Sequence, residues 1–219
     1  WLTMILSGMI PYYLTNSIDS FSNIFFETMS GYTATGSTIL DDVESLPKSI
    51  IFWRSMTHWL GGMGIIVLAI AILPLLGIGG MQLFSAEVPG SGISGDKIHP
   101  RISATAKRLW LIYFGLTILE TIALSLAGMS FFDAMNHSMS NIATGGFSTK
   151  NESLAYWNSI PSVQYIVIFF MILAGTNYLL IYSAIIGNFK KLLTNTEFLW
   201  YVSFILIFVI VTSFSIYNF

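Results

Sequence analysis

Two short runs rich in threonine, glycine and serine carry the residue types that suit ion binding in this sequence. The first run, TATGST, covers residues 33–38, and the second, ATGGFS, covers residues 143–148. Each follows a short stretch that we expect to be a helix, residues 19–30 and 131–141. Backbone carbonyls, threonine hydroxyls and the negative end of a helix together suit a dehydrated monovalent cation, because they replace the oxygens of its water shell.

These two runs occupy the same place in an internal repeat. A shift of 110 positions places Phe21 on Phe131, Met29 on Met139 and Gly36 on Gly146. A shift of 114 then places Pro47 on Pro161 and Gly61 on Gly175, so only the intervening loop differs in length. We call residues 1–78 the first copy and residues 109–190 the second copy. Self-similarity at a fixed spacing indicates a repeated architecture.

The stretch before each run is too short to cross a bilayer. At the standard rise it gives about 16–18 Å of helix, roughly half of the hydrocarbon thickness. Ser17 or Asp19 is a candidate N-cap for the first helix, and Ser130 for the second. We therefore predict a half-helix that enters the membrane and returns as extended backbone, which is tolerated only when it is buried in protein or lines a wet cavity. Gly36 and Gly146 are expected at positive φ, where glycine is unstrained.

Composition makes lipid the solvent for much of this chain. Of its 219 residues, 54% are hydrophobic and 9% are charged, against about 25% charged in an ordinary soluble domain. The net charge of −2 gives no reason to expect a nucleic acid partner, and the absence of cysteine excludes a disulfide scaffold, a thiolate zinc site and a cysteine nucleophile.

Three segments have the length and apolarity of membrane spans, residues 109–129, 163–187 and 198–217. A fourth, residues 50–76, carries Arg54 and His58 near its start and Pro74 near its end. Residues 1–14 resemble the outer end of a truncated helix, so we expect the chain to be a fragment.

Basic residues predict the orientation of these spans. Six of them fall in two loops on one side, Lys97, Arg101, Lys107, Arg108, Lys190 and Lys191. The other side holds Lys48, Arg54 and Lys150. The first side is expected to be cytoplasmic, which places both threonine-rich runs toward the exterior.

An acidic cluster, Asp41, Asp42 and Glu44, also falls on the exterior side. It either concentrates cations near an entrance or is a solvated loop. Arg54 is expected to form an ion pair with Glu27 or with this cluster. Glu27 and Asp133 lie on the half-helices, where we expect them to brace the runs from behind.

Other titratable residues leave further alternatives open. Glu120 lies inside a span, which marks either a functional carboxylate such as a proton relay or a structural one bonded to the helix that carries Asn177. His58 and Ser55 are three residues apart on one helix. They are the only evident serine–histidine pair that an intramembrane hydrolase could use. His99 and His137 share no ligand spacing with His58, so a metal cluster is not expected.

Several motifs, taken in order, resemble the TrkH branch of the Trk/Ktr-type potassium-uptake transporter family. FFETMSGYTATGST at residues 25–38 resembles its first pore loop, and FWR at 52–54 with WLGGMGIIVLA at 59–69 its following helix. GGMQL at 79–83, AEVPG at 86–90 and HPRI at 99–102 are similar to its cytoplasmic connector. IATGGFST at 142–149 resembles its second filter.

The resemblance implies an all-α membrane protein built from repeated membrane helix–pore loop–membrane helix units of a four-repeat, potassium-channel-like pore. It divides this chain into repeat one (1–78), a cytoplasmic connector (79–108), repeat two (109–190) and the first helix of repeat three (191–219). The third and fourth filters would then lie outside the chain.

The resemblance also implies a function and its residues. The expected selectivity filter consists of Thr33, Ala34, Thr35 and Gly36 in the first copy and Ala143, Thr144, Gly145 and Gly146 in the second. Potassium, the transported substrate, would bind at Thr35, Gly36, Gly145 and Gly146. The family further implies a non-enzymatic potassium-uptake protein of the bacterial inner membrane without a cofactor, a homodimer, and a TrkA-like cytoplasmic nucleotide-binding regulatory subunit.

Overall fold

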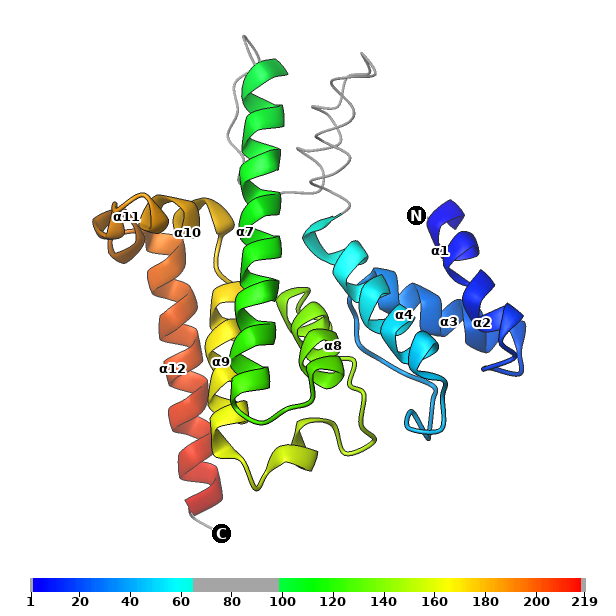
Figure 1. Cartoon of the computed structure of the whole chain (residues 1–219). Coiled ribbons are helices and arrows are strands. Elements are labelled where there is room, and N and C mark those ends of the chain that lie inside the picture. The colour runs from blue at the N-terminus through cyan, green and yellow to red at the C-terminus, as the bar shows by residue number, and fades with distance from the viewer. Residues whose placement is uncertain (1, 65–98, 218–219) are drawn as a thin grey trace. The chain divides into compact units, whose positions relative to one another are not determined.

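The computed structural model describes residues 2–64 and 99–217, and each regular element within these ranges is a helix (Figure 1). The chain divides into two compact units, Trp1–Ala174 and Gly175–Phe219. The later part of the predicted span 50–76, with Pro74, and most of the predicted connector 79–108 lie outside the described residues.

The first copy begins with four helices and a kinked turn. They are α1 (Leu2–Gly8), α2 (Ile10–Leu14), α3 (Phe21–Tyr32), α4 (Lys48–Trp59) and the turn η1 (Leu60–Gly64). Inside η1, Gly62 departs from helical geometry with φ −60° and ψ −119°. The core of this copy joins α1 and α2 to α3 and α4 through side chains that include Ile5, Tyr12, Ile24 and Ile50.

The second copy has a matching half-helix and a core of its own. Its elements are α7 (His99–Leu126), α8 (Phe131–Ile142), the short 3₁₀ helix η2 (Ser153–Trp157) and α9 (Pro161–Ala174). Leu124, Ala134, Trp157 and Val163 pack together, which joins α7, α8, η2 and α9. Each half-helix therefore packs against elements of its own copy.

The second unit consists of α10 (Tyr178–Ile185), α11 (Phe189–Leu193) and α12 (Thr196–Tyr217). Large apolar side chains cover α12 and most of them are more than half exposed, as Phe208 is at 65% and Ile216 at 75%. Such a helix needs lipid or further protein around it.

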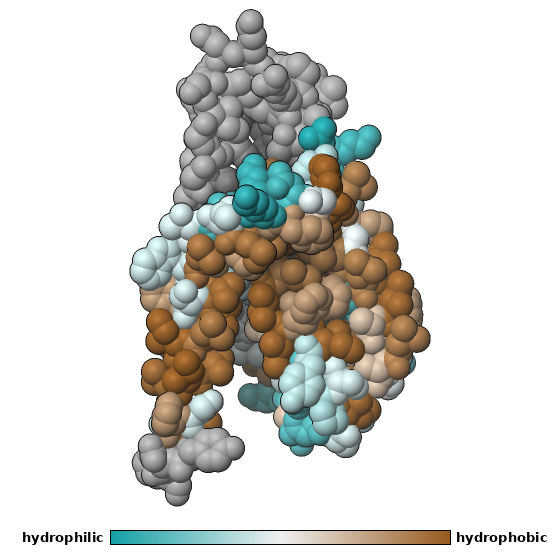
Figure 2. Space-filling view, turned by 90° about the vertical axis from the view of Figure 1, so that its left-hand side faces the viewer, coloured by the Kyte–Doolittle hydropathy of each residue, from teal (hydrophilic) through white to brown (hydrophobic). Residues whose placement is uncertain are grey.

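Two described helices are long and apolar enough to cross a membrane, Lys107–Leu126 within α7 and Thr196–Ile216 within α12. A third span results if α9 and α10 are taken as one broken helix. On the face shown in Figure 2, hydrophobic side chains cover most of the described surface and hydrophilic ones gather in separate areas. The described residues thus form an all-helical membrane protein.

The half-helices confirm the repeat. α3 and α8 have 12 residues each and begin at Phe21 and Phe131, the positions that the shift of 110 superposes. The predicted cap Ser130 is confirmed, because its Oγ accepts a hydrogen bond from the Asp133 N–H at 3.1 Å. The cap of the first helix is neither Ser17 nor Asp19 but Ser20, whose Oγ accepts from Asn23 N–H at 3.1 Å.

The predicted continuous span 163–187 is wrong. α9 ends at Ala174, and α10 starts at Tyr178 with Asn177 as its N-cap, where Asn177 Oδ1 accepts from Leu179 N–H at 3.0 Å. The break begins at Gly175, the position that the repeat matches to Gly61 in the kinked turn η1. Both copies therefore depart from regular α-helix geometry near this matched glycine.

Candidate functional site: two half-helices and the segments that follow them

The first half-helix, α3, ends in a tight turn that starts the first threonine-rich run. Thr35 N–H donates to Ser30 O at 3.0 Å and Ala34 N–H donates to Gly31 O at 3.0 Å. This pair of bonds is the Schellman termination, which requires a left-handed residue, usually glycine, just past the helix. Here that residue is Ala34, with φ +51°.

The second half-helix, α8, ends in the same way. Gly145 N–H donates to Ser140 O at 2.9 Å and Thr144 N–H donates to Asn141 O at 2.8 Å. The left-handed residue is Thr144, with φ +58°. A β-branched residue in this region costs about 1–2 kcal/mol, and such strain persists only where the surroundings fix it. Positive φ is expected from sequence mainly at glycine, so neither Ala34 nor Thr144 was predicted to be left-handed.

Two residues after each left-handed residue, a glycine also has positive φ. Gly36 has φ +77° and Gly146 has φ +100°, which agrees with the positive φ predicted for both. A Cβ built on Gly36 would overlap the carbonyl oxygen of Gly145. The two threonine-rich runs therefore lie side by side, and the backbone of one comes into contact with the backbone of the other.

Part of each run is exposed. Thr33, Thr35, Thr144 and Gly146 are exposed. Thr33 Oγ1 bonds the Thr35 hydroxyl at 2.7 Å. The arrangement thus places exposed residues of two chain segments next to the negative C-terminal ends of two helices.

A buried ion pair supports the first run. Arg54 Nε lies 2.9 Å from Glu27 Oε1, and the side chains are 2% and 0% exposed. The Thr38 hydroxyl lies 3.0 Å from both carboxylate oxygens of Glu27, and Ile39 N–H donates to Oε2 at 3.1 Å. Of the two partners expected for Arg54, Glu27 is the one with which it forms the ion pair. The bracing role predicted for Glu27 is also confirmed.

The same arginine reaches into the second copy. Arg54 Nη1 donates to the carbonyl oxygen of Ser148 at 3.3 Å, and its guanidinium carbon lies 4.2 Å from the centre of the Phe147 ring. The imidazole of His58 stacks on that ring with centroids 3.9 Å apart. One helix, α4, therefore holds the segments of both copies.

His58 also fixes the end of the second half-helix. Its Nδ1 lies 2.9 Å from Ser140 Oγ, and Ser140 Oγ accepts from Gly146 N–H at 3.0 Å. Ser55, the partner that a hydrolase would need, instead donates to Ile51 O at 3.4 Å. His58 is thus a positioning residue for the second run.

In the second copy two residues divide the bracing role. Asp133 Oδ1 accepts from the Thr149 hydroxyl at 2.6 Å, as its predicted role requires. His137, which the shift of 110 places on Glu27, has its Nε2 3.3 Å from Ser148 Oγ. Because the same shift places Ser148 on Thr38, both copies connect residue i of the half-helix to residue i+11 of the run.

The acidic cluster joins the loops that follow the two threonine-rich runs. Asn151 Oδ1 accepts from Val43 N–H at 2.7 Å, and its Nδ2 donates to Asp42 Oδ1 at 2.8 Å. Lys150 Nζ lies 3.1 Å from Glu44 Oε2. The Asn151 bond lowers the pKa of Asp42, and the bond to Glu44 raises the pKa of Lys150. Two members of the cluster thus have a structural role besides their charge.

Glu120 lies against the second half-helix rather than the helix predicted to bond it. It is fully buried, and its Oε1 accepts from Asn141 Nδ2 at 2.6 Å, while its Oε2 has no hydrogen-bond partner among the described residues. Asn177, the expected neighbour, instead has its Nδ2 3.4 Å from Glu197 Oε2. Glu120 therefore contacts the turn that ends α8.

Comparison with known proteins places this geometry in a family. The family model described as "TrkH: Cation transport protein" matches residues 1–219. The Trk system potassium uptake protein TrkH of Salmonella typhimurium is 47% identical over 192 residues, which are 87% of this chain and 39% of that protein. The Trk system potassium uptake protein TrkG of Escherichia coli is 38% identical over 220 residues, or 45% of its length.

A solved structure has a similar backbone. The crystal structure of the potassium transporter TrkH from Vibrio parahaemolyticus matches with a TM-score of 0.74 at 40% sequence identity, covering 96% of this chain and 41% of that one. The chain thus spans about two fifths of the length of the relatives it matches.

Proposed function

Because this chain belongs to the TrkH cation transport protein family, we propose that it contributes two of the filter segments through which potassium crosses a bacterial inner membrane. The first segment consists of Thr33–Gly36 and the second of Ala143–Gly146. Potassium binds at Thr35, Gly36, Gly145 and Gly146. The proposal extends to the relatives' printed activity, potassium uptake.

One observation carries this proposal: the two runs leave their half-helices in identical register and meet at Gly36 and Gly145. Both helices end in the same pair of bonds, and both runs continue through a left-handed residue and a glycine at positive φ. Two segments with the same backbone geometry are what a pore built from repeats requires. Carbonyl and hydroxyl oxygens there can replace the water of a monovalent cation.

The rest of the proposed protein follows from the family and the chain's extent. Residues 1–78 act as repeat one, 79–108 as a cytoplasmic connector, 109–190 as repeat two and 191–219 as the first helix of repeat three. Repeats three and four supply the remaining filter segments. The complete protein acts as a homodimer with a TrkA-like nucleotide-binding regulatory subunit and without a cofactor or an enzymatic reaction.

The test replaces the glycine at which the two runs meet. In Gly36→Ala the new methyl group overlaps the Gly145 carbonyl oxygen, so we expect loss of potassium uptake or of its discrimination against sodium. The assay is rubidium and potassium uptake by cells that lack their own uptake systems, with sodium as competitor. Gly115→Ala is the matched control, because among the described residues a Cβ at Gly115 would meet nothing within 4 Å beyond the nearby backbone of its own helix. Wild-type uptake and selectivity in Gly36→Ala, at equal protein level, would refute the proposed filter.

A further inference from the structure

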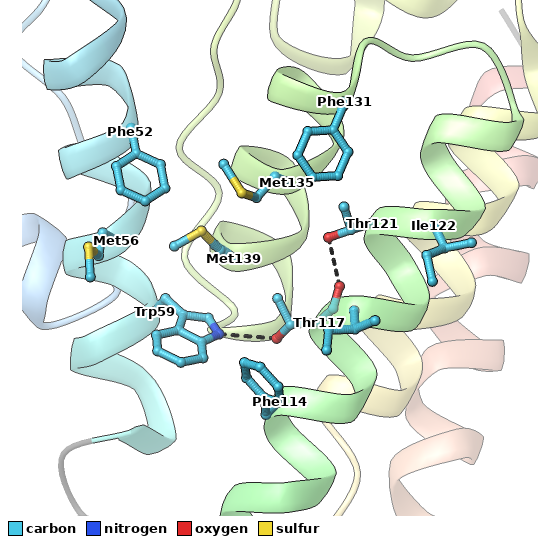
Figure 3. A pocket seen from close by; sticks show the side chains of 11 residues that line it. Phe52, Met56, Trp59, Phe114, Thr117, Thr121, Ile122, Phe131, Met135 and Met139 are labelled. Carbon is cyan, nitrogen blue, oxygen red and sulfur yellow. Dashed lines mark hydrogen bonds between the residues drawn. The ribbon is translucent and has the colours of Figure 1, made fainter.

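An apolar groove of about 350 Å³ lies between α4, α7 and α8. It is on the opposite side of α8 from the contact with His58 of α4. Phe52 and Met56 line it from α4, and Phe131, Met135 and Met139 line it from α8 (Figure 3). Its volume is at the lower end of the range for small-ligand sites, about 300–1,000 Å³. Filter residues do not line it.

The hydroxyl and indole groups in the wall of this groove are already paired. Thr121 Oγ1 donates to Thr117 O at 2.8 Å, and Thr117 Oγ1 donates to Tyr113 O at 2.9 Å. Trp59 Nε1 donates to Thr117 Oγ1 at 3.1 Å (Figure 3). Water in the groove would find few partners, because a buried water needs two to four polar contacts. A hydrocarbon chain needs none.

The groove opens where lipid is the solvent. Its α7 wall belongs to the membrane-spanning stretch Lys107–Leu126. Ile118 and Ile122 on this wall are 43% and 52% exposed, and Phe131 at one end of the groove is 69% exposed. An apolar hollow that faces the bilayer is filled by the lipid chains that surround it unless protein covers it.

A lysine stands near the end of the groove formed by Phe52 and Phe131. Lys48 is the first residue of α4, one helical turn before Phe52, and its Nζ lies 5.6 Å from the centre of the Phe132 ring. Lys48 is exposed, and the salt bridges of the described residues, Arg54–Glu27 and Lys150–Glu44, do not include it. A lysine beside an apolar groove complements a phosphate joined to an acyl chain.

We propose that this groove binds one acyl chain of an anionic phospholipid whose phosphate lies at Lys48. The acyl chain packs against Met135 and Met139 of α8. It thereby supports the half-helix on the face turned away from the Glu27–Arg54 ion pair. The site stands on the groove and its lysine alone, whether or not the proposed filter is correct.

Native mass spectrometry of the protein in its full natural length tests the proposal. The delipidated protein is offered phosphatidylglycerol and phosphatidylcholine with identical chains, and bound lipid is counted. We expect wild type to retain phosphatidylglycerol preferentially. Lys48→Gln should reduce that preference about fivefold, the effect of one lysine at a membrane surface. Lys191→Gln removes an exposed lysine elsewhere and should leave the preference unchanged.

A second pair of variants tests the groove itself. Met135→Trp fills it and should remove the retained lipid of both kinds, whereas Leu119→Trp adds the same side chain on α7 at a position outside the groove lining and should not. Equal retention by Met135→Trp and wild type would overturn the proposal. So would a protein that retains no lipid, or one in which Met135→Trp changes only the oligomeric mass, since the groove would then hold another chain.

Discussion

Removing Arg54 should destabilise the protein far more than removing both members of its ion pair. In Arg54→Met the Glu27 carboxylate stays fully buried and keeps only the Thr38 hydroxyl and one backbone N–H. Leaving one partner of a buried pair costs about 3–5 kcal/mol. The lost guanidinium–ring contact at Phe147 adds about 1 kcal/mol. We therefore expect a loss of about 4–6 kcal/mol in the free energy of unfolding.

The double variant shows whether the stranded charge is the cause. Glu27→Gln combined with Arg54→Met leaves neither charge of the pair buried, so its cost should fall below that of Arg54→Met alone by about 2–3 kcal/mol. Equilibrium unfolding in lipid–detergent micelles measures all three variants. Arg54→Lys is a further control, because an ammonium cannot reproduce the guanidinium's separate contacts to Glu27 and to the second copy. Additive effects of the two single variants would refute this reasoning.

Three other predictions concern separate parts of the site. Gly61→Ala should lower the thermal stability and the yield of folded protein, because its Cβ would overlap the last carbonyl of α3, whereas Gly115→Ala should not; equal melting curves would contradict this. Asn151→Ala should raise the pKa of Asp42 toward 3.8, since the Asn151 bond is the main cause of its depression. A depressed pKa of Asp42 stabilises the loop contact above pH 3.8, and that contribution is lost as the pH falls through the folded pKa. Carboxyl titration by NMR should therefore show the Asp42 transition at higher pH in the variant. An unchanged titration would exclude the Asn151 bond as the cause. Glu120→Gln keeps an acceptor for the side-chain amide of Asn141, so potassium uptake should keep its rate and pH dependence. Loss of proton-gradient dependence would instead identify Glu120 as a proton relay.

Repeat matching predicted the half-helices because both copies solve the same local problem. The pattern around Phe21 and Phe131 fixed the start of one helix to within two residues and that of the other to the residue. The predicted cap at Ser130 was correct, but Ser17 and Asp19 were chosen over Ser20 because several capping residues stand together there. Cap choice depends on the angle at which the chain enters the helix, which composition does not contain.

The break after α9 was missed because apolarity does not report backbone geometry. Residues 163–187 have the composition of one span, and only the match of Gly175 to the kinked turn at Gly61 carried a signal. The left-handed Ala34 and Thr144 were missed for a related reason. Positive φ is expected at glycine, but at both positions the turn that ends the half-helix has a different residue there.

The support of the second run was only partly foreseen. Asp133 was correctly expected to brace it, but His137 was considered only as a metal ligand. The shift of 110 that superposes His137 on Glu27 was already available, and it pairs Ser148 with Thr38. A glutamate and a histidine look unrelated by residue type, although each reaches the same position of the run that follows.

Because the chain is synthesised from its N-terminus, the Glu27–Arg54 pair also matters during membrane insertion. Both residues belong to the first copy, so their opposite charges can cancel while the second copy is still being synthesised. An isolated arginine in hydrocarbon is expensive, and early pairing removes that cost during insertion. Contacts with Phe147 and Ser148 form only after the later half-helix arrives. Pairing within the first copy thus neutralises this buried arginine before its second-copy partners are present.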